Sequence, residues 1–317
     1  MSKSIDAAPV QHCHGWFRLL LERAAGLGPI TTAVAHPCDP VAVQAAAEAA
    51  AAGLITPILV GPETKIRAAA AAANVDLTRF RLIPAPHSHA AADVAVALVR
   101  AGEAGMLMKG SLHTDELLHA VLVPEAGLRT GRRLSHVYVM DVPTYPRPLL
   151  ITDAAVNIMP DLETKRDIVQ NALELAHAIG IKRPLVAILS AVETVTAKIP
   201  STLHAAALCK MADRGQITGG VLDGPLAFDN AISPLAAAEK GIVSPVAGKA
   251  DILVVPDLEA GNMLAKQLTF LAGAEAAGIV LGARVPVILT SRADPERARI
   301  ASCAVAVLLA HVAPAKV

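Results

Sequence analysis

The chain has 317 residues, more than one hydrophobic core usually holds, so the sequence favours two domains. Hydrophobic residues make up 54% and charged residues 18%, a composition that excludes a disordered chain. The formal net charge is zero, there is no basic block, and aromatic residues are only 2%, which argues against nucleic acid as a partner.

The first hundred residues alternate short aliphatic runs with longer alanine-rich stretches. The pattern predicts strands at 30–35, 55–60 and 81–84 and helices at 41–52, 63–73 and 90–101. This alternation is typical of βαβ units, whose strands are parallel, buried and continuously apolar. The predicted fold class is therefore α/β.

The middle of the chain changes character. Two strand-like runs, 137–142 and 149–152, are joined by six residues, too few for a crossover helix, so a hairpin is predicted. The glycine-rich and basic run at 127–133 just before it marks a candidate domain junction.

A second series of elements follows the hairpin. The pattern predicts helices at 162–179, 203–214 and 261–274 and strands at 185–189, 219–222 and 252–255. A last strand at 285–290 and a helix at 295–309 could complete either half of the chain, because periodicity alone does not assign them.

Targeting and metal signals are weak. Residues 1–15 have no apolar core of the signal-peptide type, and the apolar run at 300–309 is too short to span a bilayer. The four cysteines form no CxxC pair, and the clusters His12-Cys13-His14 and His87-Ser88-His89 lack a third ligand. These features predict a cytoplasmic protein with neither a membrane partner nor a bound metal.

The segment 287–296 carries the strongest local signal for a binding site. An apolar strand ends in Ser291 and Arg292 and turns directly into a helix, where an anion would meet a guanidinium and a helix N-terminus. A solvated loop arginine is the alternative. Asp294, followed by Pro295, has the usual pattern of a helix cap, and a carboxylate that binds backbone N–H groups is a poor base. We therefore expect the change Asp294→Asn to lower stability more than turnover.

Polar residues at three other strand or helix ends are candidates for contact with an anion. They are Lys109 and Gly110 after the run 105–108, Asp153 and Asn157 after the strand 149–152, and Gly261 and Asn262 near the start of the third predicted helix of the second series. A surface lysine, a turn aspartate and ordinary helix-start chemistry are the respective alternatives. The glycine-rich signatures of dinucleotide and P-loop sites, the GxSxG elbow and the HExxH motif are absent.

Seven ordered segments together resemble the phosphate acetyltransferase and butyryltransferase family. They are LMKG at 107–110, SHV at 135–137, TDAAVN at 152–157, DGPLAFD at 223–229, SPVAG at 244–248, PDLEAGN at 256–262 and TSRAD at 290–294. Their order and spacing also match. The resemblance is strong over residues 100–312 and looser over the first hundred.

The resemblance implies reversible acyl transfer between coenzyme A and inorganic phosphate, without an organic cofactor, in a homodimer. It implies two α/β domains of the isocitrate and isopropylmalate dehydrogenase type, one formed by residues 1–133 plus 281–317 and the other by 134–280, with the site in the cleft between them. Ser291 would donate a hydrogen bond to the reacting centre and Arg292 would bind phosphate, so removing Arg292 is expected to cost several kcal/mol. Asp294 completes the candidate catalytic set.

The family pattern is not matched throughout. The catalytic aspartate proposed for acetyltransferases would fall near Ala298 here, and Asp294 is the nearer carboxylate. The TSRAD and LMKG forms look more like the butyryltransferase branch, so acetyl, propionyl and butyryl groups all stay open. Two rivals also stay open: an NAD- and metal-dependent dehydrogenase of the same fold, which would need a set of helix aspartates, and a non-catalytic acyl-CoA-binding regulatory module.

Overall fold

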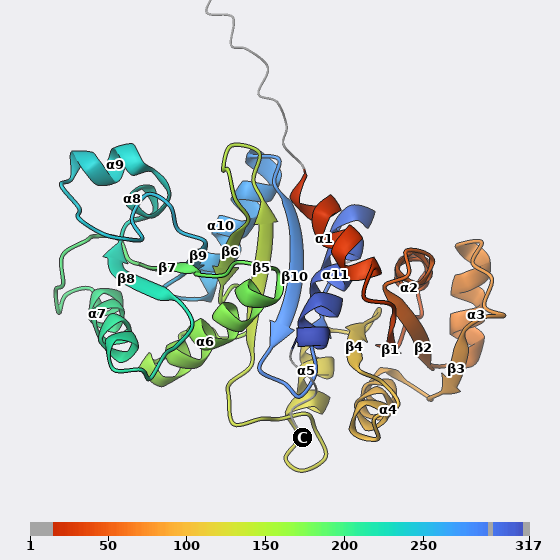
Figure 1. Ribbon diagram of the computed structural model, residues 1–317. Helices are drawn as coiled ribbons and strands as arrows, with labels where there is room; N and C mark the ends of the chain where they lie inside the picture. The colour runs from red at the N-terminus through yellow and green to blue at the C-terminus, as the bar shows by residue number, and fades with distance from the viewer. Residues whose placement is uncertain (1–14, 291–293, 313–317) are drawn as a thin grey trace, which may run out of the picture.

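The computed structural model describes residues 15–290 and 294–312 of the chain. These residues form one eleven-stranded sheet in the order β3-β2-β1-β4-β11-β10-β5-β6-β9-β7-β8. The strands are β1 Ile30–Ala35, β2 Ile55–Gly61, β3 Arg81–Pro84, β4 Met106–Lys109, β5 Ser135–Asp141, β6 Leu149–Thr152, β7 Leu185–Leu189, β8 Val221–Leu226, β9 Ile252–Val254, β10 Glu275–Leu281 and β11 Val287–Ile288. In Figure 1 the first series of strands lies on the right, the second on the left, and β5 and β10 between them.

The helices alternate with these strands. They are α1 Trp16–Ala25, α2 Pro40–Ala51, α3 Glu63–Ala72, α4 Ser88–Arg100, α5 Thr114–Leu122, α6 Leu162–Ala178, α7 Pro200–Asp213, α8 Phe228–Ile232, α9 Pro234–Glu239, α10 Leu258–Leu271 and α11 Glu296–Val312. Caps explain where several of them begin: the Asp39, Asp161 and Asp257 side chains accept hydrogen bonds from the first turns of α2, α6 and α10. No described helix is long and apolar enough to cross a bilayer.

The predicted α/β class is confirmed. The strands of the first series pair in parallel, and β5 and β6 form the predicted antiparallel hairpin. The strand predicted at 285–290 is shorter than expected, because β11 spans only two residues, Val287 and Ile288, and pairs in parallel with β4. The sequence analysis missed β10, which lies antiparallel to both β5 and β11. The division into domains stays a prediction.

The two faces of the sheet are packed differently. On one face α1, α2, α6, α7 and α11 share a single buried cluster that runs through both halves of the sheet (Figure 1). On the opposite face α4 and α5 cover one cluster, whereas α8, α9 and α10 cover a separate one. On β5, Val137 and Val139 belong to the continuous cluster, and His136 and Tyr138 point to the face where the helices are divided. This division makes room for a site above the central strands.

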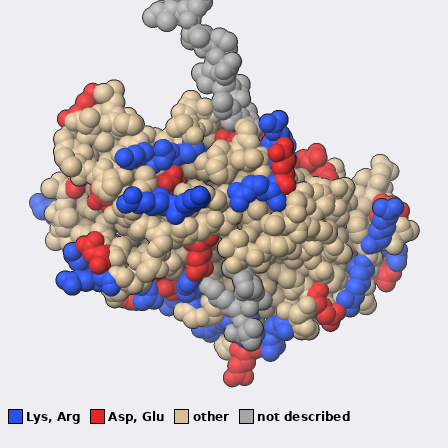
Figure 2. Space-filling view, viewed as in Figure 1, with Lys and Arg blue, Asp and Glu red and all other residues tan. Residues whose placement is uncertain are grey.

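Figure 2 shows the molecule from the side of α6, α7 and α11. Basic and acidic side chains alternate there with wide areas of uncharged surface.

Candidate functional site

A cavity of about 470 Å³ lies between the two separate clusters, beside β5 and the carboxyl ends of β4 and β11. Its walls are Lys109, Leu112, His113, Thr114, His136, Tyr138, Ala155, Leu289, Thr290 and Asp294. Lys109 and Thr290 meet because β4 and β11 are parallel neighbours, whose carboxyl ends reach the same edge of the sheet. The volume falls within the range of small-molecule sites.

Two of the three predicted catalytic residues, Ser291 and Arg292, lie outside the described residues. Their neighbours on either side, Thr290 and Asp294, both line the cavity. The described residues that flank this segment therefore both lie at the cavity wall.

Asp294 is placed differently from the cap expected of it. Helix α11 begins at Glu296, and the carbonyl oxygen of Pro295 accepts hydrogen bonds from the backbone N–H groups of Ala298 and Arg299, at 3.0 and 3.2 Å. Pro295, one residue beyond Asp294, thus provides the first helical carbonyl. Helix α11 therefore begins one residue later than the expected capping position implies, and Asp294 lines the cavity.

Lys109 and Gly110 have different surroundings. Lys109 ends β4 and lines the cavity, with its Nζ 3.4 Å from the carbonyl oxygen of Gly110. A Cβ on Gly110 would lie 2.4 Å from the carbonyl oxygen of Ala35 and 2.7 Å from backbone atoms of His36. Only a glycine therefore fits at position 110, where the chain passes close to the end of β1. This close approach fixes the position of the neighbouring Lys109.

The Asp153 carboxylate accepts hydrogen bonds from other groups of the protein. Its Oδ1 accepts hydrogen bonds from the backbone N–H groups of His136, Ala155 and Val156, at 3.2, 3.0 and 3.1 Å. Its Oδ2 accepts from the backbone N–H and the side-chain amide of Asn157, at 3.0 and 2.5 Å. The residue is only 2% exposed. These five bonds shape the 153–157 loop, which places Ala155 in the cavity wall.

Helix α10 supports the same loop. A Cβ on Gly261 would lie 2.9 Å from the carbonyl oxygen of Asp153, and the Asn262 side chain donates to the carbonyl oxygen of Ala154 at 3.2 Å. Neither Gly261 nor Asn262 is among the residues that line the large cavity. Of the predicted substrate-binding residues the structure thus brings Lys109 to this cavity, whereas Gly261 and Asn262 pack against the loop that forms part of its wall.

A second cavity, of about 560 Å³, lies at the other end of α5. The residues that line it include Arg129, Gly131, Arg132, Arg133, Asn157 and Asp167. Arg132 forms an ion pair with Glu174 at 2.6 Å.

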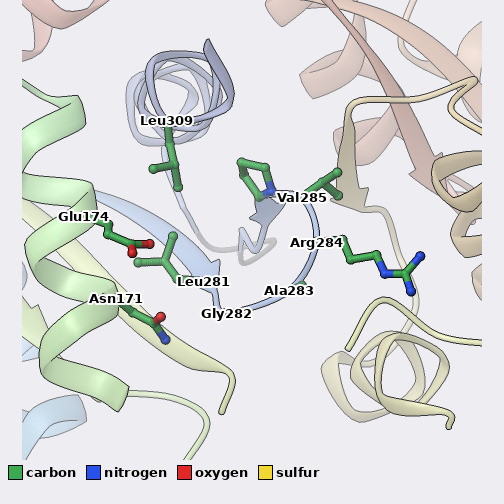
Figure 3. A pocket seen from close by; sticks show the side chains of 9 residues that line it. Asn171, Glu174, Leu281, Gly282, Ala283, Arg284, Val285 and Leu309 are labelled. Carbon is green, nitrogen blue, oxygen red and sulfur yellow. The ribbon is translucent and has the colours of Figure 1, made fainter. Parts of the chain in front are cut away.

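Figure 3 shows a third, much smaller cavity, of about 40 Å³. Asn171 and Glu174 on α6 face the loop that follows β10, Leu309 approaches from α11, and Arg284 extends away from them. The space is close to that of a single water molecule. It belongs to the packing of α6 against α11.

His136 and Tyr138 are cavity residues to which the sequence analysis gave no role. Their rings meet edge to face, with centroids 4.4 Å apart and planes at 72°. Burial lowers the pKa of His136 to about 4, so the ring is neutral near pH 7. The signal available in the sequence was the alternation along β5, which puts both rings on one face.

Comparison with known proteins gives a consistent result. A sequence profile of the family described as "Phosphate acetyl/butaryl transferase" matches residues 85–307. The chain is 68% identical to a phosphate acetyltransferase of Rhizobium meliloti over 291 residues, which cover 92% of each chain. It is 45% identical to a phosphate butyryltransferase of Clostridium acetobutylicum over 278 residues, or 88% of this chain and 92% of the relative.

A solved structure has the same fold. The branched-chain phosphotransacylase of Enterococcus faecalis V583 superposes with a TM-score of 0.78 at 32% identity, over 89% of this chain and 99% of the other. The segment that matches the family profile contains Lys109, Tyr138 and Asp294, three of the residues that line the large cavity.

Proposed function

Because the chain belongs to the phosphate acetyl/butaryl transferase family, we propose that it moves an acyl group between coenzyme A and inorganic phosphate. The observation that carries this proposal is the 68% identity to a phosphate acetyltransferase over nearly the whole of both chains. The dehydrogenase and regulatory-module alternatives are not favoured, because the relatives at high identity are named as transferases.

The reaction would be a direct displacement in the large cavity. A phosphate oxygen attacks the thioester carbonyl carbon, a tetrahedral oxyanion forms, and the carbon–sulfur bond breaks to give acyl phosphate and the thiolate of coenzyme A. Asp294 would take the proton of the attacking phosphate, which the thiolate finally receives. Lys109 and Arg292 would hold the phosphate, and Ser291 would donate a hydrogen bond to the reacting centre. No organic cofactor or metal enters this scheme; coenzyme A is a substrate.

The second cavity would receive the phosphate groups of coenzyme A. Arg132 is already paired with Glu174, whereas Arg129 and Arg133 form no ion pair within the described part of the chain. Guanidinium groups suit phosphate oxygens because they bind them in a bidentate manner. Asn157 would contact the same substrate, since it lines this cavity, and Asp153, Gly110, Gly261 and Asn262 would act by holding the substrate-facing segments in place.

Other features support the proposed assembly and location. Met263, Phe270 and Leu271 on α10 are 57%, 79% and 85% exposed, and this apolar stripe supports a homodimer. Cys38, Cys209 and Cys303 are free thiols, which supports a reducing, cytoplasmic location. The domain boundaries proposed from the sequence, 1–133 plus 281–317 and 134–280, would put the large cavity in the cleft between the two domains.

One assay tests the proposed function and ranks the acyl groups. Free thiol released from acetyl-CoA, propionyl-CoA and butyryl-CoA would be measured with and without inorganic phosphate. We expect release that depends on phosphate for at least one of the three. No phosphate-dependent release from any of them would contradict acyl transfer to phosphate.

A further inference from the structure

The two tyrosines of the chain differ in what their hydroxyl groups do. The Tyr145 hydroxyl donates a hydrogen bond to the carbonyl oxygen of Ala250 at 2.6 Å and so belongs to the fold. Tyr138 lies on the central strand β5 and lines the large cavity. Its hydroxyl forms no hydrogen bond with any residue that the structure describes. The Tyr138 hydroxyl is therefore available to a molecule in the cavity.

The position of the Tyr138 ring is fixed by its neighbours. Gly278 lies opposite Tyr138 in the pairing of β5 with β10. A Cβ on Gly278 would lie 3.0 Å from Nε2 of His136, 3.1 Å from the carbonyl oxygen of Leu289 and 3.5 Å from Cε1 of Tyr138. The glycine thus leaves the space in which the two rings meet. His136 is 1% exposed, and its packing edge to face holds the tyrosine ring in one orientation.

The cavity around Tyr138 suits an acyl group. Leu112, Leu289 and Ala155 provide apolar wall, and the Asp294 carboxylate is the nearby charge that acts on Tyr138. Burial first and this carboxylate second raise the pKa of Tyr138, so the hydroxyl stays protonated as a donor. A neutral donor beside a carboxylate is a poor partner for a phosphate dianion, which needs cations. It is a good partner for a carbonyl oxygen that gains negative charge only during the reaction.

We infer that Tyr138 is a further catalytic residue, whose hydroxyl donates a hydrogen bond to the carbonyl oxygen of the acyl group. The inference rests on the proposed acyl transfer. In the tetrahedral intermediate this bond stabilises the oxyanion, while the carbon–oxygen bond to phosphate forms and the carbon–sulfur bond breaks. His136 and Gly278 are positioning residues, because they act through the tyrosine ring.

The test is the variant Tyr138→Phe, which removes one oxygen atom and keeps the ring. Loss of one donor to a reaction oxyanion is expected to lower kcat by about 100-fold, with little change in the KM for phosphate. The matched control is Tyr145→Phe. It loses the bond to Ala250, so its melting temperature should fall while its kcat stays at the wild-type value. Gly278→Ala would press on the His136 ring that holds Tyr138, at 3.0 Å from its Nε2, and should lower kcat while Tyr138 keeps its hydroxyl.

The possible outcomes separate this inference from the function on which it rests. A wild-type protein without phosphate-dependent thiol release contradicts the acyl transfer. An active wild type together with a folded Tyr138→Phe variant of unchanged kcat overturns the role of Tyr138. An unchanged kcat with a raised KM for phosphate overturns the assignment to the carbonyl oxygen, because the hydroxyl would then bind phosphate.

Discussion

Asp153 and Asp294 both follow an apolar strand, yet the structure gives their carboxylates opposite surroundings. Asp153 is buried and accepts five hydrogen bonds from its own loop and from β5. Asp294 is half-buried on the wall of the large cavity, next to the end of β11. The same sequence pattern thus produces one residue that holds a loop together and one that lines the cavity. What separates them is their place in the fold: Asp153 is enclosed by its own loop and β5, whereas Asp294 lies at a cavity wall.

The variant Asp294→Asn tests the cavity side of this comparison and should have the largest effect. It keeps the shape of the side chain but removes the proton acceptor, so kcat should fall by about 10²- to 10⁴-fold. The free energy of unfolding should change by less than about 1 kcal/mol, since Pro295 and not Asp294 starts the helix. Thiol release and urea unfolding measure the two quantities. A clear loss of stability at wild-type turnover would restore the capping role expected from the sequence.

The variant Asp153→Asn tests the supporting side. An amide offers one acceptor oxygen where five N–H donors now converge, and its own NH₂ group would face the donors of Asn157. We expect the free energy of unfolding to fall by about 2–4 kcal/mol. Asp76→Asn is the matched control. The Asp76 carboxylate also accepts a hydrogen bond from a nearby backbone N–H, that of Thr78, but it lies on the exposed surface. Equal losses in urea unfolding for the two variants would contradict the special role of the buried carboxylate.

The variant Gly261→Ala tests whether the packing of α10 stabilises the 153–157 loop. The added Cβ would lie 2.8 Å from Cγ2 of Val255 and 2.9 Å from the carbonyl oxygen of Asp153, so the helix or the loop must shift. A loss of stability of about 1–3 kcal/mol is expected from such overpacking. Gly15→Ala is the control, because nothing lies within 4 Å of a Cβ there. A Gly261→Ala variant that melts at the wild-type temperature would show that the loop does not depend on this contact.

Much of the fold was predictable because the spacing of hydrophobic residues along the sequence indicates which residues are buried. The limits of β1, β3, β6 and β7 agree with the sequence prediction, since each is a short aliphatic run between helix-forming stretches. Strand β10 was missed because its sequence, Glu-Ala-Ala-Gly-Ile-Val-Leu, begins with residues that disfavour strands. Its conformation is set by pairing with β5 over seven residues. That contact joins segments too distant in sequence for local patterns to show.

The site was predictable only in part, for a related reason. Lys109 and Asp294 lie at the ends of secondary-structure elements, where polar residues are typical of binding sites, and both line the cavity. Tyr138 lies inside a strand, where a ring is normally read as core. Alternation puts it on one face of β5, but only the packing of the helices determines that this face is open there. Asp153 was interpreted as a ligand residue, because its five donors come from β5 and from a loop whose path the sequence does not reveal.

The last expected effect concerns the pH dependence of stability and the imidazole that packs against Tyr138. Burial lowers the pKa of His136 to about 4, against about 6.5 in the unfolded chain. Between these values the unfolded state binds a proton that the folded state does not. The free energy of unfolding should therefore fall as the pH drops from about 6.5 to 4, by at most about 1.4 kcal/mol per pH unit from this residue.

The variant His136→Phe isolates that contribution. His36 and His204 also have pKa values lowered by burial and contribute in the same direction, so the wild type alone does not identify the group. A phenylalanine keeps a ring against Tyr138 and has no proton to bind. The difference in unfolding free energy between variant and wild type should shift in favour of the variant on acidification below pH 6.5. If the unfolding free energies of variant and wild type, from urea titrations at pH 7, 6 and 5, change in parallel, His136 does not stay neutral in the folded protein. The His136 ring would then hold Tyr138 less rigidly than its packing indicates.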